Sequence, residues 1–97
     1  MAGIQSKEIE IMDLNELRNE INTIDDEILS LFLRRMEVAG QVADYKRANG
    51  LPIYQPEREQ AILESVAARA GEMGGYAQVL FSTLMDLSKK YQAEKGV

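Results

Sequence analysis

The residues that could do chemistry in this chain are polar side chains placed on otherwise apolar helix faces. Between residues 13 and 47, apolar side chains recur at steps of three and four, but the position between Leu31 and Val38 holds Arg35. Lys46 follows about three helical turns later, so both cations stand on one face of a helix. Polar residues also occur at one end of the apolar stripe of each of two later helical stretches. They are Arg58, Glu59, Ser88 and Gln92.

Each of these polar residues has a structural explanation when it is taken alone. An arginine in a heptad seam can fix the register of a helix pair, and a lysine at the edge can extend to water. Together they are better explained by one site, because a cluster of buried cations requires a bound anion. Guanidinium groups bind carboxylates through two parallel hydrogen bonds. We therefore predict a site for a small dianion.

The composition narrows the chemistry further. The 97 residues include no His, Cys or Trp, which excludes disulfides, thiol nucleophiles, Cys/His zinc sites and an imidazole base. We predict neither a metal nor a cofactor. The net charge of −5 argues against nucleic acid as a partner. The sequence shows neither a membrane-spanning apolar run nor a signal peptide, which predicts a cytoplasmic protein.

The elements that must position these residues are all helices. Residues 13–47 form the long helix, with Asp13 as N-cap, Glu16 completing a capping box and an end at 48–50. A second helix opens at Gln55-Pro56 and ends near Ala70, and 71–75 form a break. A third helix runs from about Tyr76 to the region of Ala93. The side chains expected to face inward are Ile62, Leu63, Val66 and Ala70 on the second helix, and Ala77, Leu80, Phe81, Leu84, Met85 and Leu87 on the third. We predict an all-α chain with a flexible leader, 1–12, and one helical domain, 13–97.

The unequal helix lengths favour a homodimer. The two shorter helices together roughly match the long one, so one chain would leave much of its seam uncovered. The seam consists of Leu14, Leu17, Ile21, Ile24, Ile28, Leu31, Val38, Val42 and Tyr45. Two long helices side by side, each overlaid by short ones, solve this in an interlocked helical bundle. Arg18 is turned about 100° from Arg35 around the helix, so in such a dimer it could reach the partner's site.

From Asp13 to Gln92 the chain resembles the all-α chorismate mutase family. The matching stretches, in order, are 17–21 with 24–25, 34–39, 42–46, 56–59, and Ser88 with Gln92. The resemblance implies a stand-alone, monofunctional enzyme that converts chorismate to prephenate. It implies that Arg35 holds a substrate carboxylate, that Arg18 of the partner holds a carboxylate, and that Lys46 contacts a carboxylate and the ether oxygen.

The resemblance also assigns the remaining site residues. Gln92 would donate a hydrogen bond to the ether oxygen, Glu59 would accept one from the ring hydroxyl, and Ser88 would assist at a carboxylate. Arg58 would line the pocket. Several family members have Asp where this chain has Gln55, which would still cap the second helix.

The predicted reaction suits these residue types. It is an intramolecular Claisen rearrangement that needs a restrained conformer and donors at the ether oxygen, and no acid, base or nucleophile. Two alternatives stay open. Isochorismate pyruvate lyase of the same family shares the cationic pocket, although Glu59 favours the mutase. In a non-catalytic dimeric helical module, Arg35 would merely pair with a carboxylate.

Overall fold

The long helix of the computed structural model, which describes residues 13–95, is α2, Leu14–Ala48. Its start is capped by Asp13, whose Oδ1 accepts the Asn15 backbone N–H at 2.9 Å. The Glu16 backbone N–H donates to the Asp13 carbonyl at 3.0 Å. At the other end Leu51 N–H donates to the Lys46 carbonyl at 2.8 Å, and Gly50 takes a φ of 66°. This is the Schellman arrangement in which glycine ends a helix. The predicted leader, 1–12, lies outside the described residues.

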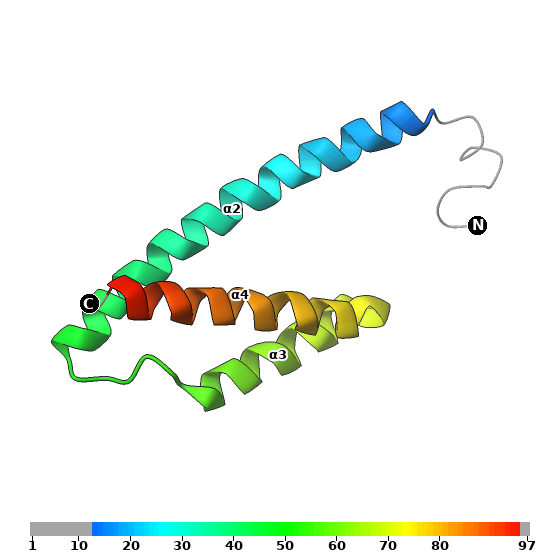
Figure 1. The fold of residues 1–97 in the computed structure, drawn as a ribbon. Helices are drawn as coiled ribbons and strands as arrows, with labels where there is room; N and C mark the ends of the chain where they lie inside the picture. The colour runs from blue at the N-terminus through cyan, green and yellow to red at the C-terminus, as the bar shows by residue number, and fades with distance from the viewer. Residues whose placement is uncertain (1–12, 96–97) are drawn as a thin grey trace. The chain divides into compact units, whose positions relative to one another are not determined.

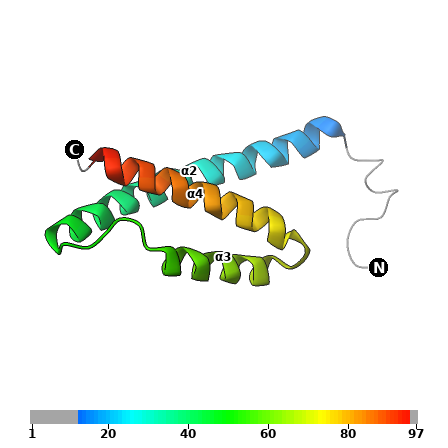
Figure 2. The ribbon, with the colours of Figure 1, turned by 60° about the horizontal axis from the view of Figure 1, so that its bottom comes forward.

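The later helices are α3, Pro56–Ala70, and α4, Gly74–Lys95, which lie side by side in Figures 1 and 2. A single 3-10 turn, η1, Gly71–Met73, joins them, so the predicted break of 71–75 is too long. Gly71 makes the reversal with a φ of 57°. Gly74 belongs to α4, and a Cβ there would lie 2.8 Å from the Ala67 carbonyl oxygen. Glycine at this position therefore permits the close approach of α3 and α4.

All regular structure in residues 13–95 is helical, which confirms the predicted all-α class. The described residues divide into two units, 13–34 and 35–95. The first unit is the beginning of α2, and the second contains the rest of α2 with α3 and α4. Across residues 13–95, none of the helices combines the length and the apolar character that crossing a membrane requires.

The core of the second unit is small. Ala43, Val66 and Met85 are its buried apolar side chains. Two residues predicted to face inward on α4 do not: Leu80 is 55% exposed and Leu87 is 41% exposed. α3 and the second half of α2 together leave part of the apolar stripe of α4 uncovered, so these side chains remain open.

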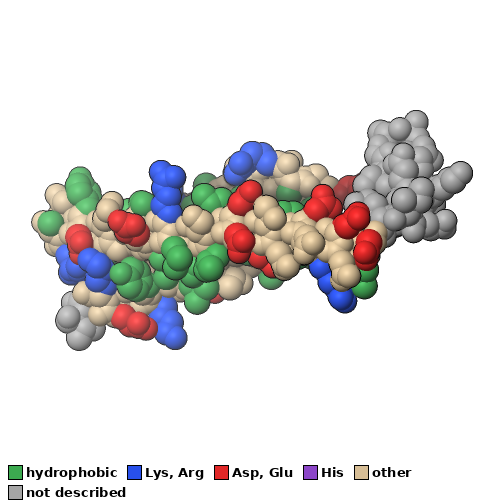
Figure 3. All heavy atoms as spheres, turned by 90° about the horizontal axis from the view of Figure 1, so that it is seen from above, with side chains coloured by type: hydrophobic (Ala, Val, Ile, Leu, Met, Phe, Trp, Pro, Cys, Tyr) green, Lys and Arg blue, Asp and Glu red, His purple; other side chains and the backbone are tan. Residues whose placement is uncertain are grey.

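Most seam side chains of the first unit are exposed, and Leu17 is half-buried. Ile21, Ile24, Ile28 and Leu31 each expose between 49% and 64% of their surface. On the face drawn in Figure 3, hydrophobic side chains gather mainly on the part farther from the larger group of grey residues, among both acidic and basic side chains. A contiguous row of exposed Ile and Leu is unusual on a soluble chain and marks a surface that packs against something else.

Candidate active site

A cavity of about 250 Å³ lies within the second unit, between the end of α2, the link that follows it, α3 and α4. Seven of the eight predicted site residues line it: Arg35, Lys46, Gln55, Arg58, Glu59, Ser88 and Gln92. Arg18, the eighth, is an exposed residue of the first unit and does not belong to this lining. The structure thus brings seven residues together, and the roles assigned to them remain predictions.

Arg35 is held by α4. Its Nη1 donates to the Ser88 Oγ at 2.6 Å and to the Leu84 carbonyl at 3.4 Å. Ser88 is 8% exposed, and its hydroxyl also donates to the Leu84 carbonyl at 2.9 Å. Because a guanidinium carries five N–H donors in one plane, fixing one nitrogen orients the others. Ser88 and Leu84 therefore orient the plane of a half-buried guanidinium at the wall of the cavity.

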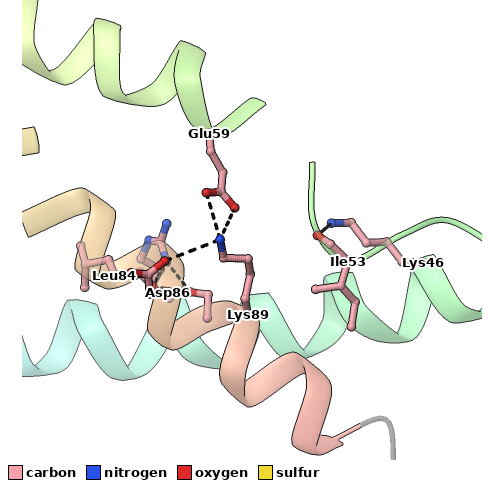
Figure 4. Close-up of polar contacts among 8 residues, drawn as sticks. Lys46, Ile53, Glu59, Leu84, Asp86 and Lys89 are labelled. Carbon is pink, nitrogen blue, oxygen red and sulfur yellow. Dashed lines mark hydrogen bonds and ion pairs between the residues drawn. The ribbon is translucent and has the colours of Figure 1, made fainter. Parts of the chain in front are cut away.

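Lys46 and Gln92 each donate to a backbone carbonyl. The Lys46 ammonium donates to Ile53 at 2.9 Å, as Figure 4 shows. Gln92, which is 6% exposed, donates from Nε2 to the Ala39 carbonyl at 2.9 Å. These bonds use one N–H of each group, whereas an ammonium has three and an amide nitrogen two. Both side chains are held in position and keep donors for a ligand.

Glu59 is paired with a residue that the sequence analysis did not single out. The Lys89 ammonium lies 2.9 Å from Glu59 Oε2 and 3.1 Å from Oε1, and 3.5 Å from the Asp86 carboxylate. It also stands 4.5 Å from the centre of the Tyr54 ring. The hydrogen bond to Glu59 is the main cause that raises the pKa of Lys89 above 10.5. Figure 4 shows this ammonium between the two carboxylates.

The helical spacing of α4 could have predicted that Lys89 faces the cavity. Met85, a buried residue of α4 that lines the cavity, stands four residues earlier on the same face. A lysine at that spacing, next to Ser88, belongs to the face that carries Ser88 and Gln92. Its acidic partner comes from α3, and sequence spacing along α4 contains no information about that contact.

Gln55 corrects one prediction. It occupies the N-cap position of α3, and its backbone carbonyl accepts the Glu59 N–H at 3.2 Å. Its side chain makes no capping hydrogen bond, so the expectation that the amide caps the helix is wrong. Pro56 follows directly and removes one N–H that a cap would satisfy. The Gln55 side chain is half-buried and lines the cavity instead.

The charge of the cavity is positive. Four cations line it, Arg35, Lys46, Arg58 and Lys89, against the single carboxylate of Glu59. Its apolar wall consists of Val38, Ala39, Val42, Ile53, Ile62 and Met85. Cations around an apolar wall fit a small molecule that combines carboxylates with a hydrocarbon ring. The chain has no His or Cys, so the functional groups of this lining are guanidinium, ammonium, carboxylate, amide and hydroxyl.

Comparison with known families matches residues 17–93 to the family described as chorismate mutase type II. Among curated relatives, a T-protein of Haemophilus influenzae is 37% identical over 83 residues, which cover 86% of this chain and 22% of the relative. A chorismate mutase of Methanocaldococcus jannaschii is 41% identical over 56 residues, covering 58% of this chain and 57% of the relative.

A third relative, a 4-amino-4-deoxychorismate mutase of Streptomyces venezuelae, is 31% identical over 62 residues, or 64% of this chain and 60% of that protein. The chain spans about a fifth of the T-protein of H. influenzae and less than two thirds of the other two relatives. No solved structure gives a significant match.

Proposed function

The chain belongs to the chorismate mutase type II family, and from this premise we propose that it rearranges chorismate to prephenate. The observation that carries the proposal is the cavity of the second unit, where cations and an amide donor line an apolar wall. Chorismate is a dianion with a hydrocarbon ring, so both kinds of surface have a counterpart on the substrate. The match extends over 77 of the 97 residues, counted from 17 to 93, and includes every lining residue.

In the proposed mechanism the site restrains the substrate and stabilises charge. Arg35, oriented by Ser88 and Leu84, binds one carboxylate through its remaining N–H groups. Lys46 and Gln92 direct their free donors at the ether oxygen, where negative charge grows as the C–O bond breaks. Glu59 accepts the hydrogen bond of the ring hydroxyl. Holding the chair-like conformer removes much of the entropic barrier of a unimolecular reaction.

We also propose that the working form is an interlocked homodimer. The exposed seam residues of the first unit supply an apolar surface for a second copy. Arg18 stands on that same helix and is exposed. In the dimer it would bind a substrate carboxylate in the partner's cavity. Each cavity would then have two guanidinium groups for carboxylates, Arg35 from its own chain and Arg18 from the other.

The assay that tests the function follows the loss of chorismate's ultraviolet absorbance and identifies the product. Wild type should consume chorismate and form prephenate, and Arg35→Ala should not. Release of pyruvate from isochorismate without prephenate formation would instead establish the lyase. If neither substrate reacts, and Arg35→Leu leaves the protein as stable as wild type or more stable, Arg35 is a structural seam residue and the mutase proposal fails.

The names of two relatives indicate substrates that differ in the substituent at ring position 4. The S. venezuelae relative, by its name, acts on the analogue with an amino group in place of the hydroxyl. At neutral pH that amine is a cation, whereas a hydroxyl is neutral. In the proposed pose this substituent faces Glu59, so the surroundings of Glu59 determine the preference.

A further inference from the structure

Resting on the proposed function, we infer that Lys89 is the residue that makes this site select a neutral ring substituent over a cationic one. Lys89 is assigned no role by the family resemblance, and it touches both oxygens of the carboxylate that faces the ring substituent. It acts through Glu59 and is therefore a positioning and specificity-determining residue.

The geometry supports a fixed ammonium at this place. Lys89 is restrained from three sides, by Glu59 of α3, by Asp86 of its own helix and by the Tyr54 ring. Its side chain is 28% exposed and that of Glu59 is 23% exposed. Both side chains are partly shielded from water, so the pair is screened less than a fully exposed one, and its charges act on a ligand placed beside it.

The two ring substituents meet this pair differently. A hydroxyl can donate one hydrogen bond to a Glu59 oxygen, because each oxygen has two lone pairs and the contact with Lys89 uses only one of them. An ammonium at the same position would bring a second cation next to Lys89 and compete with it for one carboxylate. Juxtaposed like charges are a means by which binding sites reject the wrong ligand. Lys89 thus penalises the amino analogue and leaves the hydroxyl compound unhindered.

The test uses the full-length protein and three variants. Lys89→Met removes the charge and keeps the length of the side chain, and Lys89→Arg retains the charge. Lys90→Met removes a charge from the exposed neighbouring lysine, which does not line the cavity. For each protein, kcat/KM is measured on chorismate and on 4-amino-4-deoxychorismate, and calorimetry gives the Kd of both compounds.

We expect the preference of wild type for chorismate, expressed as the ratio of the two kcat/KM values, to fall about tenfold or more in Lys89→Met. Lys89→Arg and Lys90→Met should keep the ratio of wild type. A loss of activity on both substrates by the same factor in Lys89→Met would indicate a merely structural lysine and overturn the inference.

The same experiment separates the inference from the proposed function. If wild type rearranges chorismate and the ratio is unchanged in Lys89→Met, the function stands and the role of Lys89 is wrong. If wild type rearranges neither compound, the mutase proposal fails. The ratio of the two Kd values, compared between wild type and Lys89→Met, then tests the role of Lys89 in selectivity. An unchanged Kd ratio in Lys89→Met then overturns the inference, and a fall of that ratio supports it.

Discussion

The two halves of α2 carry the same heptad pattern and differ in what surrounds it. In residues 35–48 the side chains of Arg35, Asp44 and Lys46 make hydrogen bonds to α4 or to the following link, and Ala43 is fully buried. In residues 14–34 the seam side chains Ile21, Ile24, Ile28 and Leu31 are about half exposed or more. The seam side chains themselves stay open in both halves, since Val38, Val42 and Tyr45 are 48%, 40% and 64% exposed. The comparison teaches that polar contacts beside the seam, and not the seam, hold the second half against its neighbours, and that the partner of the seam is left open.

The largest expected effect comes from replacing Arg18 in the first half of α2 and Arg35 in the second, each in its own variant. Arg18→Ala and Arg35→Ala should each lower kcat/KM by about a thousandfold, because each removes a charged bidentate contact to the substrate. Refolding the two inactive variants together at equal amounts should restore about a quarter of wild-type activity. Half of the dimers are then mixed, and one of their two sites has both arginines.

No recovery on mixing would contradict a site shared between protomers. Refolding each variant alone is the control, and it should give no recovery. If Arg18→Ala is as active as wild type, the first half of α2 contributes packing only, and the contrast between the two halves would concern stability alone.

Two donors of the second unit offer the next largest effect. Lys46→Ala and Gln92→Ala should each slow the chemical step by on the order of a hundredfold, because each removes a donor from the ether oxygen. Single-turnover kinetics measure this step, and circular dichroism should show unchanged helicity. Turnover like that of wild type in both variants would refute their assigned roles.

Two residues of the first half of α2 are equally exposed, yet their alanine variants should lose different amounts of unfolding free energy. Ile28 lies on the seam and is 57% exposed, while Leu33 lies on the opposite face and is 58% exposed. If a second chain covers the seam, Ile28→Ala should lower the free energy of unfolding by about 2–4 kcal/mol. Leu33→Ala should lower it by about 1 kcal/mol or less.

Urea unfolding at several protein concentrations measures both variants of the seam pair. The midpoint of wild type should rise with concentration, as it does for a protein whose folded form is a dimer. Equal effects of Ile28→Ala and Leu33→Ala, with a midpoint independent of concentration, would show that the seam has no partner.

The sequence predicted the all-α class and the bounds of α2 because each depends on local signals. Periodicity, the Asp13 cap and the Gly50 turn all act within a few residues. Spacing along single helices also selected six of the seven predicted residues that line one cavity, whereas Gln55 was named only through the family resemblance. The Lys89–Glu59 pair was missed because its partners are 30 residues apart. The break was predicted as 71–75, which is too long, because a run of glycines indicates a turn. Gly74 is instead part of α4, where it allows close contact with α3.

The smallest expected effect is on Tm, from removal of the Asp44–Lys95 ion pair between the second half of α2 and α4. The Lys95 ammonium hydrogen-bonds both oxygens of Asp44, and this bond is the main cause that lowers the pKa of Asp44 below 3.8. A lowered carboxyl pKa stabilises the fold above 3.8, and the contribution is lost as the pH falls through the folded-state pKa. Asp44→Asn should therefore lower Tm slightly at pH 7 and leave it unchanged at pH 2. Because both side chains are partly exposed, high salt should remove most of the difference at pH 7. A Tm difference between wild type and Asp44→Asn that persists at pH 2 would mean that Asp44 contributes through packing, and that the polar attachment of this half of α2 depends on Arg35 and Gln92.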